Sequence, residues 1–514
     1  MRWREALVPR AMTRVAVVAR TSALRDALVR VADAGTVEID RVVSSADQPI
    51  SPLSRARPAL TGRTEVTPAL APEPPDIDEL ARAGRADLLA GEAQLADVSA
   101  QAVVDGEVAA VVGWVPTDRL PDLAARLAPV GAAAVPLPRP RGVEPPTAAA
   151  PTPARRAFGP IVDTYGTIPY ADVDPTILAG IAYAVMFGAM FGDVGHGALL
   201  VVLALLIRAA GTGARDRPEA SPSGSAAGRA GTEARHGRGA PSSETSDAGG
   251  VDAGLGSGRS RWLARLRPHW SLVATAGLMA MVFGVVYGEA FGPTGLVPPG
   301  LIEPLQEPVR MLGLGVGIGA VLLAGAYVLA IVNRLREGGW ALALYAPAGV
   351  AGALVFLAAG LGAGAAYWRN GWVALASAVL AATGVTLAFV GLLAHAGGRI
   401  TGVLQALVET VDLVIRLGAN IVSFARLAAF GLTHAVLTLI TWQATTGLWA
   451  SGAAGKVAAV LVVVVGNALA FGLEALVAGI QALRLEYYEL FSRVFQAEGR
   501  PFRPWHVPTA ALDR

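Results

Sequence analysis

The sequence predicts a mainly α-helical, polytopic membrane protein with a small N-terminal α/β domain. Of its 514 residues, 53% are hydrophobic and only 16% are charged, and the mean hydropathy is +0.49. After Pro175 the chain contains repeated apolar stretches of the length that crosses a bilayer, about 20 residues. Before residue 158, apolar residues instead alternate over short stretches, as they do in strands. Together these features exclude a disordered chain and a plain soluble enzyme.

Composition and motifs exclude several functional classes. The chain has no cysteine, so it forms no disulfide, thiolate metal site or cysteine nucleophile. A net charge of +2 gives no indication of a nucleic-acid partner. A GxxxxGKS/T phosphate loop is absent, so we expect no ATP hydrolysis by the chain itself. The six histidines are dispersed and no HExxH motif occurs, so we expect neither a bound metal nor a cofactor.

The region 1–158 is predicted to form two small cytoplasmic α/β lobes. A strand over Thr13–Ala19, a helix over Leu24–Ala34 and a strand over Thr36–Val43 give one β-α-β unit. A linker at 45–76, rich in Pro, Ser and Arg, precedes the second lobe. This lobe and its Pro-rich connector to the membrane comprise a helix near 77–95, a strand over Glu107–Val115, a helix over Asp118–Leu127, a strand over Ala132–Leu137 and the connector at 138–155.

Residues 159–209 lead into the membrane and are predicted to form a hairpin. The stretch 176–208 is apolar for about 33 positions, which as one helix would span roughly 50 Å, whereas a bilayer core is about 30 Å thick. We therefore expect one helix over 176–191 and a return helix over 198–209. The residues that favour a turn near the middle are Gly192, Asp193, Gly195, His196 and Gly197.

The next polar segment, 210–268, is predicted to be a disordered cytoplasmic loop. Its interior is rich in Gly, Ser and Ala with scattered charge. Arginines flank both of its ends, which favours the cytoplasmic side of the membrane. If the N-terminal lobes are also cytoplasmic, an even number of crossings separates them from this loop, and we expect both termini in the cytoplasm.

The rest of the membrane region is predicted to contain four ordinary spans and then two long ones. Arginines occur in alternate loops between the four spans, as the positive-inside rule requires. The last two stretches, in 400–498, are too long for upright helices and contain polar groups, so we expect long, tilted helices. The total is about eight transmembrane helices. The segments are 270–290, 309–333, 341–366 and 372–396 within 269–399, then 403–449 and 456–495, and finally a cytoplasmic tail at 499–514.

Arg426 is the most informative single residue, because apolar sequence surrounds it on both sides. A charged side chain at the bilayer centre costs about 2.5–3.5 kcal/mol on insertion scales, so such residues usually face protein or water. One interpretation is a structural arginine that is ion-paired or that extends to the interface. The other is a fixed positive charge beside an ion path.

Polar neighbours favour the second interpretation. At 100° per residue, one helical side carries Asp412, Ser423, Arg426, Thr433 and His434. Asp412 lies roughly 21 Å from Arg426 along the helix axis, toward the cytoplasm, and His434 lies on the outward side. One polar stripe therefore approaches Arg426 from each aqueous phase.

The final long helix repeats this pattern. Asn467, Glu474 and Gln481 are spaced by seven residues and so share one face. Arg484 lies deeper, although its acidic neighbours Glu486 and Glu489 also fit a cytoplasmic interface, and Glu474 also fits a structural pair. The two helices outline two half-paths that Arg426 separates, since arginine keeps its charge at any accessible pH.

At these residues the sequence resembles the membrane stator subunit, called subunit a or subunit I, of rotary V/A-type ATPases. Order and spacing agree with that family over most of 100–505. Four blocks carry the resemblance: GWVP at Gly113–Pro116, MFGAMFGDVGHG at Met186–Gly197, SFARLAAFGLTHA at Ser423–Ala435 and EALVAGIQALRLEYYELFSRVF at Glu474–Phe495.

The resemblance implies a role for each of these residues. Arg426 would face the ion-binding carboxylates of a rotating ring of c (proteolipid) subunits, and Arg484 would be the arginine of the second helix. His434 and Glu474 would line the half-channel that opens away from the cytoplasm, and Asp412 would lie on the cytoplasmic side. The ion would be H⁺ or Na⁺, and the N-terminal lobes would join the peripheral and central stalks. The resemblance further implies a multi-pass protein of a prokaryotic plasma membrane, in contact with lipid.

The soluble arm departs from the family pattern. In the family this arm is usually far longer and contains a coiled coil, whereas the segment 45–80 is short and rich in proline. Two other functions remain open. A stand-alone secondary transporter would have Arg426 and Glu474 at its substrate site and would transport without partners. A structural scaffold would tolerate the loss of Arg426.

Overall fold

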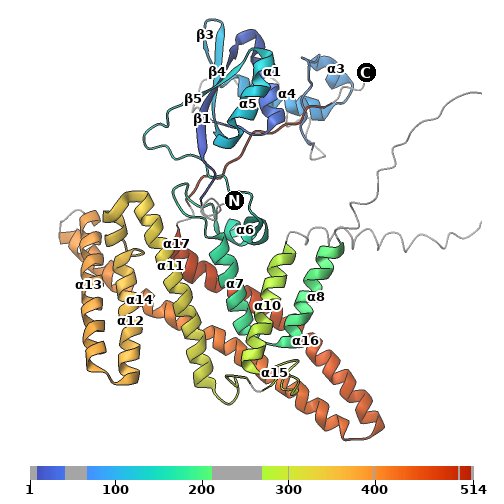
Figure 1. Ribbon diagram of the computed structural model, residues 1–514. Coiled ribbons are helices and arrows are strands. Elements are labelled where there is room, and N and C mark those ends of the chain that lie inside the picture. The colour runs from blue at the N-terminus through green and yellow to red at the C-terminus, as the bar shows by residue number, and fades with distance from the viewer. Residues whose placement is uncertain are drawn as a thin grey trace, which may run out of the picture.

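The computed structural model describes residues 8–40, 66–210, 269–298, 300–396, 400–495 and 498–510. A small sheet domain stands at one end of a set of long helices (Figure 1). Among the described residues, six helices are long and apolar enough to cross a membrane. The predicted fold class is therefore confirmed. The predicted loop at 210–268, apart from its first residue, and the predicted linker before residue 66 lie outside the described residues.

The N-terminal domain is built on one antiparallel sheet. Its strand order is β2-β4-β1-β5, with β3 beside β4. The prediction of two separate lobes is wrong, because the strands of both predicted lobes share this sheet, and β4 lies between β1 and β2. An isolated strand pair is only marginally stable in water, and the shared sheet gives β1 a neighbour on both edges. The strands are β1 (Met12–Arg20), β2 (Glu38–Ile39), β3 (Val103–Asp105), β4 (Val108–Pro116) and β5 (Ala133–Leu137).

Helices of this domain bury the apolar residues of the sheet. Val17 of β1 packs with Val31 and Leu127, which come from two different helices. A second cluster joins Leu28 and Leu95 to Val111 of β4. The helices are α1 (Leu24–Ala34), α3 (Ile77–Arg82), α4 (Ala86–Ser99) and α5 (Leu120–Leu127).

The described C-terminal segment, 498–510, returns to the N-terminal domain. The Trp505 amide donates to the Val37 carbonyl at 2.9 Å, and the Leu70 amide donates to the Pro508 carbonyl at 2.9 Å. Val507 is fully buried in the core of the domain. The segment predicted as a plain cytoplasmic tail is therefore part of the folded domain, and it ties the last membrane helix to the sheet.

The first membrane helices pack closely against α10. α6 (Pro153–Tyr165) leads to α7 (Thr176–Met190) and α8 (Val194–Ala210), and these are followed by α10 (Trp270–Tyr287). α8 begins at Val194, so the connection to α7 is shorter than the turn that the sequence suggested. A Cβ atom on Gly197 would lie 2.7 Å from the Gly277 carbonyl oxygen of α10. Only glycine permits this approach of two helix backbones.

The next helices form the far side of the bundle. They are α11 (Pro308–Tyr345), α12 (Val350–Trp368) and α13 (Gly371–Ala396). The sequence placed a loop between two spans at 334–340. The helical conformation breaks within that stretch, at Gly339, whose φ is 73° and whose ψ is -162°, and helix resumes to Tyr345.

The predicted long helix over 403–449 lies within one candidate span, Ile400–Trp449, which has a one-residue irregularity. α14 (Ile400–Ser423) and α15 (Ala425–Trp449) meet at Phe424, which is fully buried. No proline or glycine marks the break. Phe424 packs against Gly319 of α11, where a Cβ atom would lie 2.1 Å from its ring. A tertiary contact therefore accompanies a break that local sequence does not reveal.

The last long helix is α16 (Ala453–Leu485), which continues into a π-helical turn at Glu486–Phe491 and into α17 (Ser492–Val494). α15 and α16 run obliquely to the other membrane helices (Figure 1). Only 6% of the most apolar window of α16 is buried, against 39% for α11. α16 therefore presents a long apolar surface that the described chain does not cover.

Candidate functional site along α15 and α16

Arg426 lies in the first turn of α15, two residues after the break at Phe424, and is half-buried. It has no hydrogen bond or ion pair with any described residue. The charged groups whose fields act on its guanidinium are Arg484 and Glu489. Arg484 is exposed near the end of α16. Two arginines from neighbouring helices thus lie beside an uncovered apolar surface.

His434 and Glu474 are in direct contact, as their placement on adjacent helices allows. His434 Nδ1 hydrogen-bonds to Glu474 Oε2, which joins α15 to α16. His434 is 2% exposed, and the Glu474 side chain is 14% exposed. His434 lies eight residues after Arg426, about 12 Å along the helix axis. These two predicted residues are brought together in the buried layer on one side of Arg426.

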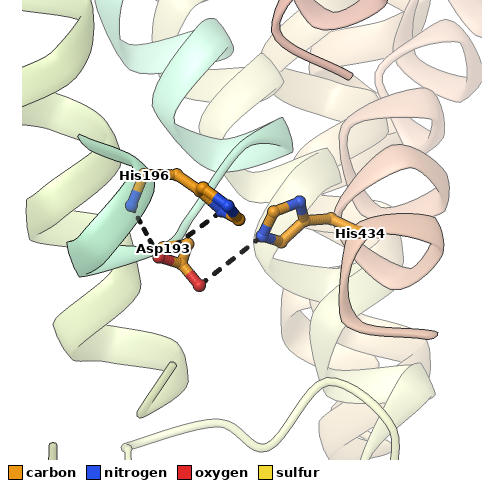
Figure 2. A group of neighbouring side chains, drawn as sticks. All are labelled: Asp193, His196 and His434. Carbon is orange, nitrogen blue, oxygen red and sulfur yellow. Dashed lines mark hydrogen bonds and ion pairs between the residues drawn. The ribbon is translucent and has the colours of Figure 1, made fainter. Parts of the chain in front are cut away.

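The turn between α7 and α8 adds two residues to this cluster, Asp193 and His196. Figure 2 shows the Asp193 carboxylate reaching toward both imidazoles. Its Oδ1 atom lies 3.6 Å from His196 Nδ1, and its Oδ2 atom lies 3.8 Å from His434 Nε2. Asp193 and His196 are fully buried. The outer cluster, defined here as Asp193, His196, His434 and Glu474, therefore joins three membrane helices.

Backbone amides fix the Asp193 carboxylate. Oδ1 accepts from the His196 amide and the Phe291 amide, and Oδ2 accepts from the Gly292 amide, each at 2.9 Å. The first of these bonds caps the start of α8, and the other two hold the segment after α10. Charge-assisted bonds of this kind offset the cost of burying a carboxylate. Asp193 is therefore both a structural anchor and part of the cluster.

Asp193, His196 and His434 are also the described residues that could hold a metal ion. Each offers one ligand atom, and these atoms lie within 4.8 Å of one another. Dispersal of the histidines along the sequence gave no sign of such a group. The fold brings the His196 and His434 rings to a centroid separation of 5.5 Å.

The remaining predicted residues are not joined into one stripe. Asn467 donates to the Val463 carbonyl of its own helix, and its Oδ1 atom is buried without a protein partner in the described chain. Gln481 Oε1 is buried in the same way. Ser423 is half-buried at the end of α14. Asp412 forms an exposed ion pair with Arg416 at 2.6 Å, on the other side of the break at Phe424.

A second buried acidic group lies at the end of the bundle that faces the sheet domain. Asp172, in the segment between α6 and α7, is fully buried. Burial, together with the nearby Glu337 carboxyl, raises the pKa of Asp172 to about 7. The neighbouring Val173 amide donates to Asn333 Oδ1 at 3.0 Å, and Asn333 Nδ2 donates to the Val494 carbonyl at 2.9 Å. This network connects α11 with α17.

Sequence reasoning used Asp193 and His196 only as markers of a turn and did not select Glu289, which is 6% exposed after α10. The sequence does place these ionisable residues within an apolar region, and ionisable residues inside membrane segments usually have a functional role. The contacts of Asp193 and His196 with His434 could not be inferred, because they join positions more than 200 residues apart.

The fold and the site define a polytopic membrane protein whose spans carry buried ionisable groups and an arginine that has no counterion among the described residues. The family model for the V-type ATPase 116kDa subunit family matches residues 99–217. The chain is 23% identical over 353 residues to the A-type ATP synthase subunit I of Pyrococcus horikoshii, covering 68% of this chain and 45% of that protein.

Two further relatives agree with this result. The A-type ATP synthase subunit I of Archaeoglobus fulgidus is 24% identical over 452 residues, which cover 77% of this chain and 58% of that protein. The V-type ATP synthase subunit I 2 of Treponema pallidum is 49% identical over 53 residues, 10% of this chain and 12% of that protein. These similarities support the V-type ATPase 116 kDa subunit family as the one that the chain resembles. The chain spans about half the length of the curated relatives that it matches.

Proposed function

We propose that the chain is the stator subunit of the membrane sector of a rotary V/A-type ATPase. In this role it is non-catalytic and forms two ion half-channels against a rotating ring of c subunits. It couples the movement of protons, or of Na⁺, to rotation and to ATP hydrolysis or synthesis on other subunits. The observation that carries the proposal is Arg426, unpaired within the described chain beside the uncovered apolar surface of α16.

The chemistry of Arg426 supports a partner that supplies an anion. Holding a guanidinium within a span is costly, and no described acidic side chain pairs with it. A carboxylate on a passing ring helix would ionise beside Arg426. In lipid the same carboxylate would be neutralised by H⁺ or Na⁺, because a bare charge there is expensive. Arg426 would thus separate the two half-channels while the ring turns.

Polar groups support a route on each side of Arg426. The outer route would pass the outer cluster and Asn467, whose unpartnered oxygen suits ordered water. The inner route would pass Gln481, Ser423 and Asp412, near the break between α14 and α15 and the π-helical turn after α16. Irregular helix segments of this kind frequently occur at functional sites.

The proposal also gives the sheet domain and the lipid-facing helices a location. The sheet domain, within 1–158, and the returning segment 498–510 would lie in the cytoplasm, so that both termini are cytoplasmic. This domain would contact the peripheral and central stalk subunits. Lipid would surround the exposed apolar sides of α12 and α13 in a prokaryotic plasma membrane.

The test is ATP-driven ion movement by the purified complex in vesicles. We expect Arg426→Ala to abolish it while the complex assembles normally, because the barrier and the anion partner are lost. Arg310→Ala is the matched control, since Arg310 is an exposed arginine that pairs with Glu307 at 2.5 Å. Retained pumping by Arg426→Ala would contradict the role and would support a scaffold. Ion transport by the purified chain alone would support a secondary transporter instead.

A further inference from the structure

We propose that Asp193, His196 and His434 form a Zn²⁺ site within the outer cluster, and that Zn²⁺ bound there closes the outer half-channel. The three side chains converge from the α7–α8 turn and from α15 (Figure 2). The binding of Zn²⁺ stands on geometry alone. The closure of the channel rests on the proposed function.

The separations between ligand atoms suit a metal better than a direct hydrogen bond. The His196 Nδ1–Asp193 Oδ1 distance is 3.6 Å, and the His434 Nε2–Asp193 Oδ2 distance is 3.8 Å. Hydrogen bonds between such atoms are about 2.7–3.2 Å long. Metal–ligand bonds of about 2.0–2.1 Å in a tetrahedron place neighbouring ligand atoms about 3.3 Å apart. The 3.6 Å and 3.8 Å distances involve different oxygens of Asp193, and one ligand atom from each residue lies within 4.8 Å of the others, so side-chain rotation would bring the three atoms onto one ion.

Both imidazoles offer lone pairs that no described group uses. His196 is fully buried, and neither of its ring nitrogens has a hydrogen-bond partner in the described chain. His434 is 2% exposed, and its Nε2 atom is likewise without a partner. A buried polar atom left unsatisfied costs about 1–3 kcal/mol. A metal ion between the rings would remove this cost.

The groups around the three ligands orient them as in protein zinc sites. His434 Nδ1 is hydrogen-bonded to the Glu474 carboxylate, which places the proton on Nδ1 and leaves the Nε2 lone pair free for the metal. A carboxylate behind a ligating histidine is the usual second contact in zinc proteins. The three amides that bond Asp193 leave Oδ2, the oxygen nearest His434, with one acceptor position free.

The ligand set favours Zn²⁺ over Ca²⁺ and Mg²⁺. Two imidazoles and one carboxylate match the three-ligand zinc sites that keep a fourth position for water. Ca²⁺ and Mg²⁺ prefer sets of oxygen atoms, which this cluster lacks. The site therefore takes a divalent metal of the zinc type rather than the transported ion.

A pocket of about 460 Å³ lies on the segment after α10, next to the residues that contact the cluster. Glu289 lines this pocket together with Tyr287 and Leu439. The Glu289 carbonyl accepts from the Val194 amide at 3.0 Å, directly beside Asp193. If the sheet domain is cytoplasmic, the pocket opens on the opposite side of the membrane. Zn²⁺ arriving from that side would occupy His434 and add positive charge to the proposed path.

The experiment is Zn²⁺ titration of the purified full chain, without c subunits or ATP. We expect one Zn²⁺ per chain, and Zn²⁺ X-ray absorption of the wild type showing two imidazole nitrogens. His196→Gln and His434→Gln should each weaken binding by at least about tenfold, and Glu474→Gln by about 10–100-fold. His395→Gln is the matched control, because this histidine lies on α13, outside the cluster, and is hydrogen-bonded to the Gly391 carbonyl of its own helix.

Each outcome decides between named alternatives. No stoichiometric binding, or absorption without imidazole ligands, would overturn the site and leave a water-filled polar cluster. Wild-type affinity for Zn²⁺ in His196→Gln and His434→Gln would also overturn the site. If the chain binds Zn²⁺ but Zn²⁺ on the non-cytoplasmic face of vesicles leaves pumping unchanged, only the proposed closure of the outer half-channel is overturned. Because binding is measured on the chain alone, its failure is distinct from any failure of the Arg426 experiment.

Discussion

Arg426 and His434 lie on the same helix, eight residues apart, yet their surroundings differ completely. His434 is buried among acidic groups of its own chain, from α16 and from the α7–α8 turn. Arg426 has no counterion in the described chain and lies beside surface that the chain leaves uncovered. The outer cluster is therefore completed within the subunit, whereas the Arg426 region requires a partner. A loss at His434 should first affect folding, and a loss at Arg426 should affect only function.

The largest expected effect is on stability at His434. We expect His434→Ala to lower the free energy of unfolding by about 3 kcal/mol, because the Glu474 carboxylate loses its hydrogen-bond partner. Arg426→Ala should change it by less than about 1 kcal/mol, since no contact within the chain is lost. Unfolding in mixed detergent measures both. Equal destabilisation by the two variants would remove the distinction between the two regions.

A smaller effect is expected when Glu474 keeps its shape but loses its charge. Glu474→Gln should slow ATP-driven ion movement without blocking it, because the amide still bonds His434 but exchanges no proton. Initial rates in vesicles provide the measurement, and Glu307→Gln, at the exposed start of α11, is the control. An unchanged rate would exclude Glu474 from the ion path.

Asp172 extends the comparison to a buried acidic group that lies near another carboxyl group, that of Glu337. The pKa of Asp172 is raised from 3.8 to about 7 by burial. The folded state therefore binds this proton more tightly than the unfolded state, so the contribution to stability is full below pH 3.8 and is lost as pH rises through about 7. We expect Tm to fall between pH 5 and pH 8, and Asp172→Asn to reduce that fall.

The control for this pH dependence is Asp122→Asn, which changes an exposed carboxylate on α5. It should leave the pH dependence of Tm as it is in the wild type. A pH profile that Asp172→Asn does not alter would show that another group is responsible.

The smallest effect is expected at the exposed ion pair of α14. Arg416→Ala should change the free energy of unfolding by only about 0.3–0.5 kcal/mol, because exposed pairs four residues apart on a helix contribute little. The rate of pumping should stay close to that of the wild type. A strong loss of pumping would show that Arg416 belongs to the inner half-channel together with Asp412.

Much of the membrane architecture could be predicted from local sequence. Long apolar stretches identify spans by length, and a charge within them is conspicuous because of its cost, which is why Arg426, His434 and Glu474 could be selected. The break at Phe424 could not be predicted, since its visible correlate is a contact with Gly319 on another helix. Asp193 and His196 were seen only as turn residues because their partner lies on α15.

The sequence by itself determined which segments enter the membrane and which of them carry charge, because hydrophobicity and the cost of burying a charge are properties of short stretches. Only the tertiary structure decided which charges meet. It placed Asp193 beside His434, merged two expected lobes into one sheet and returned 498–510 to the N-terminal domain. These contacts join residues that are far apart in the chain. They depend on how whole helices and strands pack together, so they cannot be predicted from short stretches of sequence.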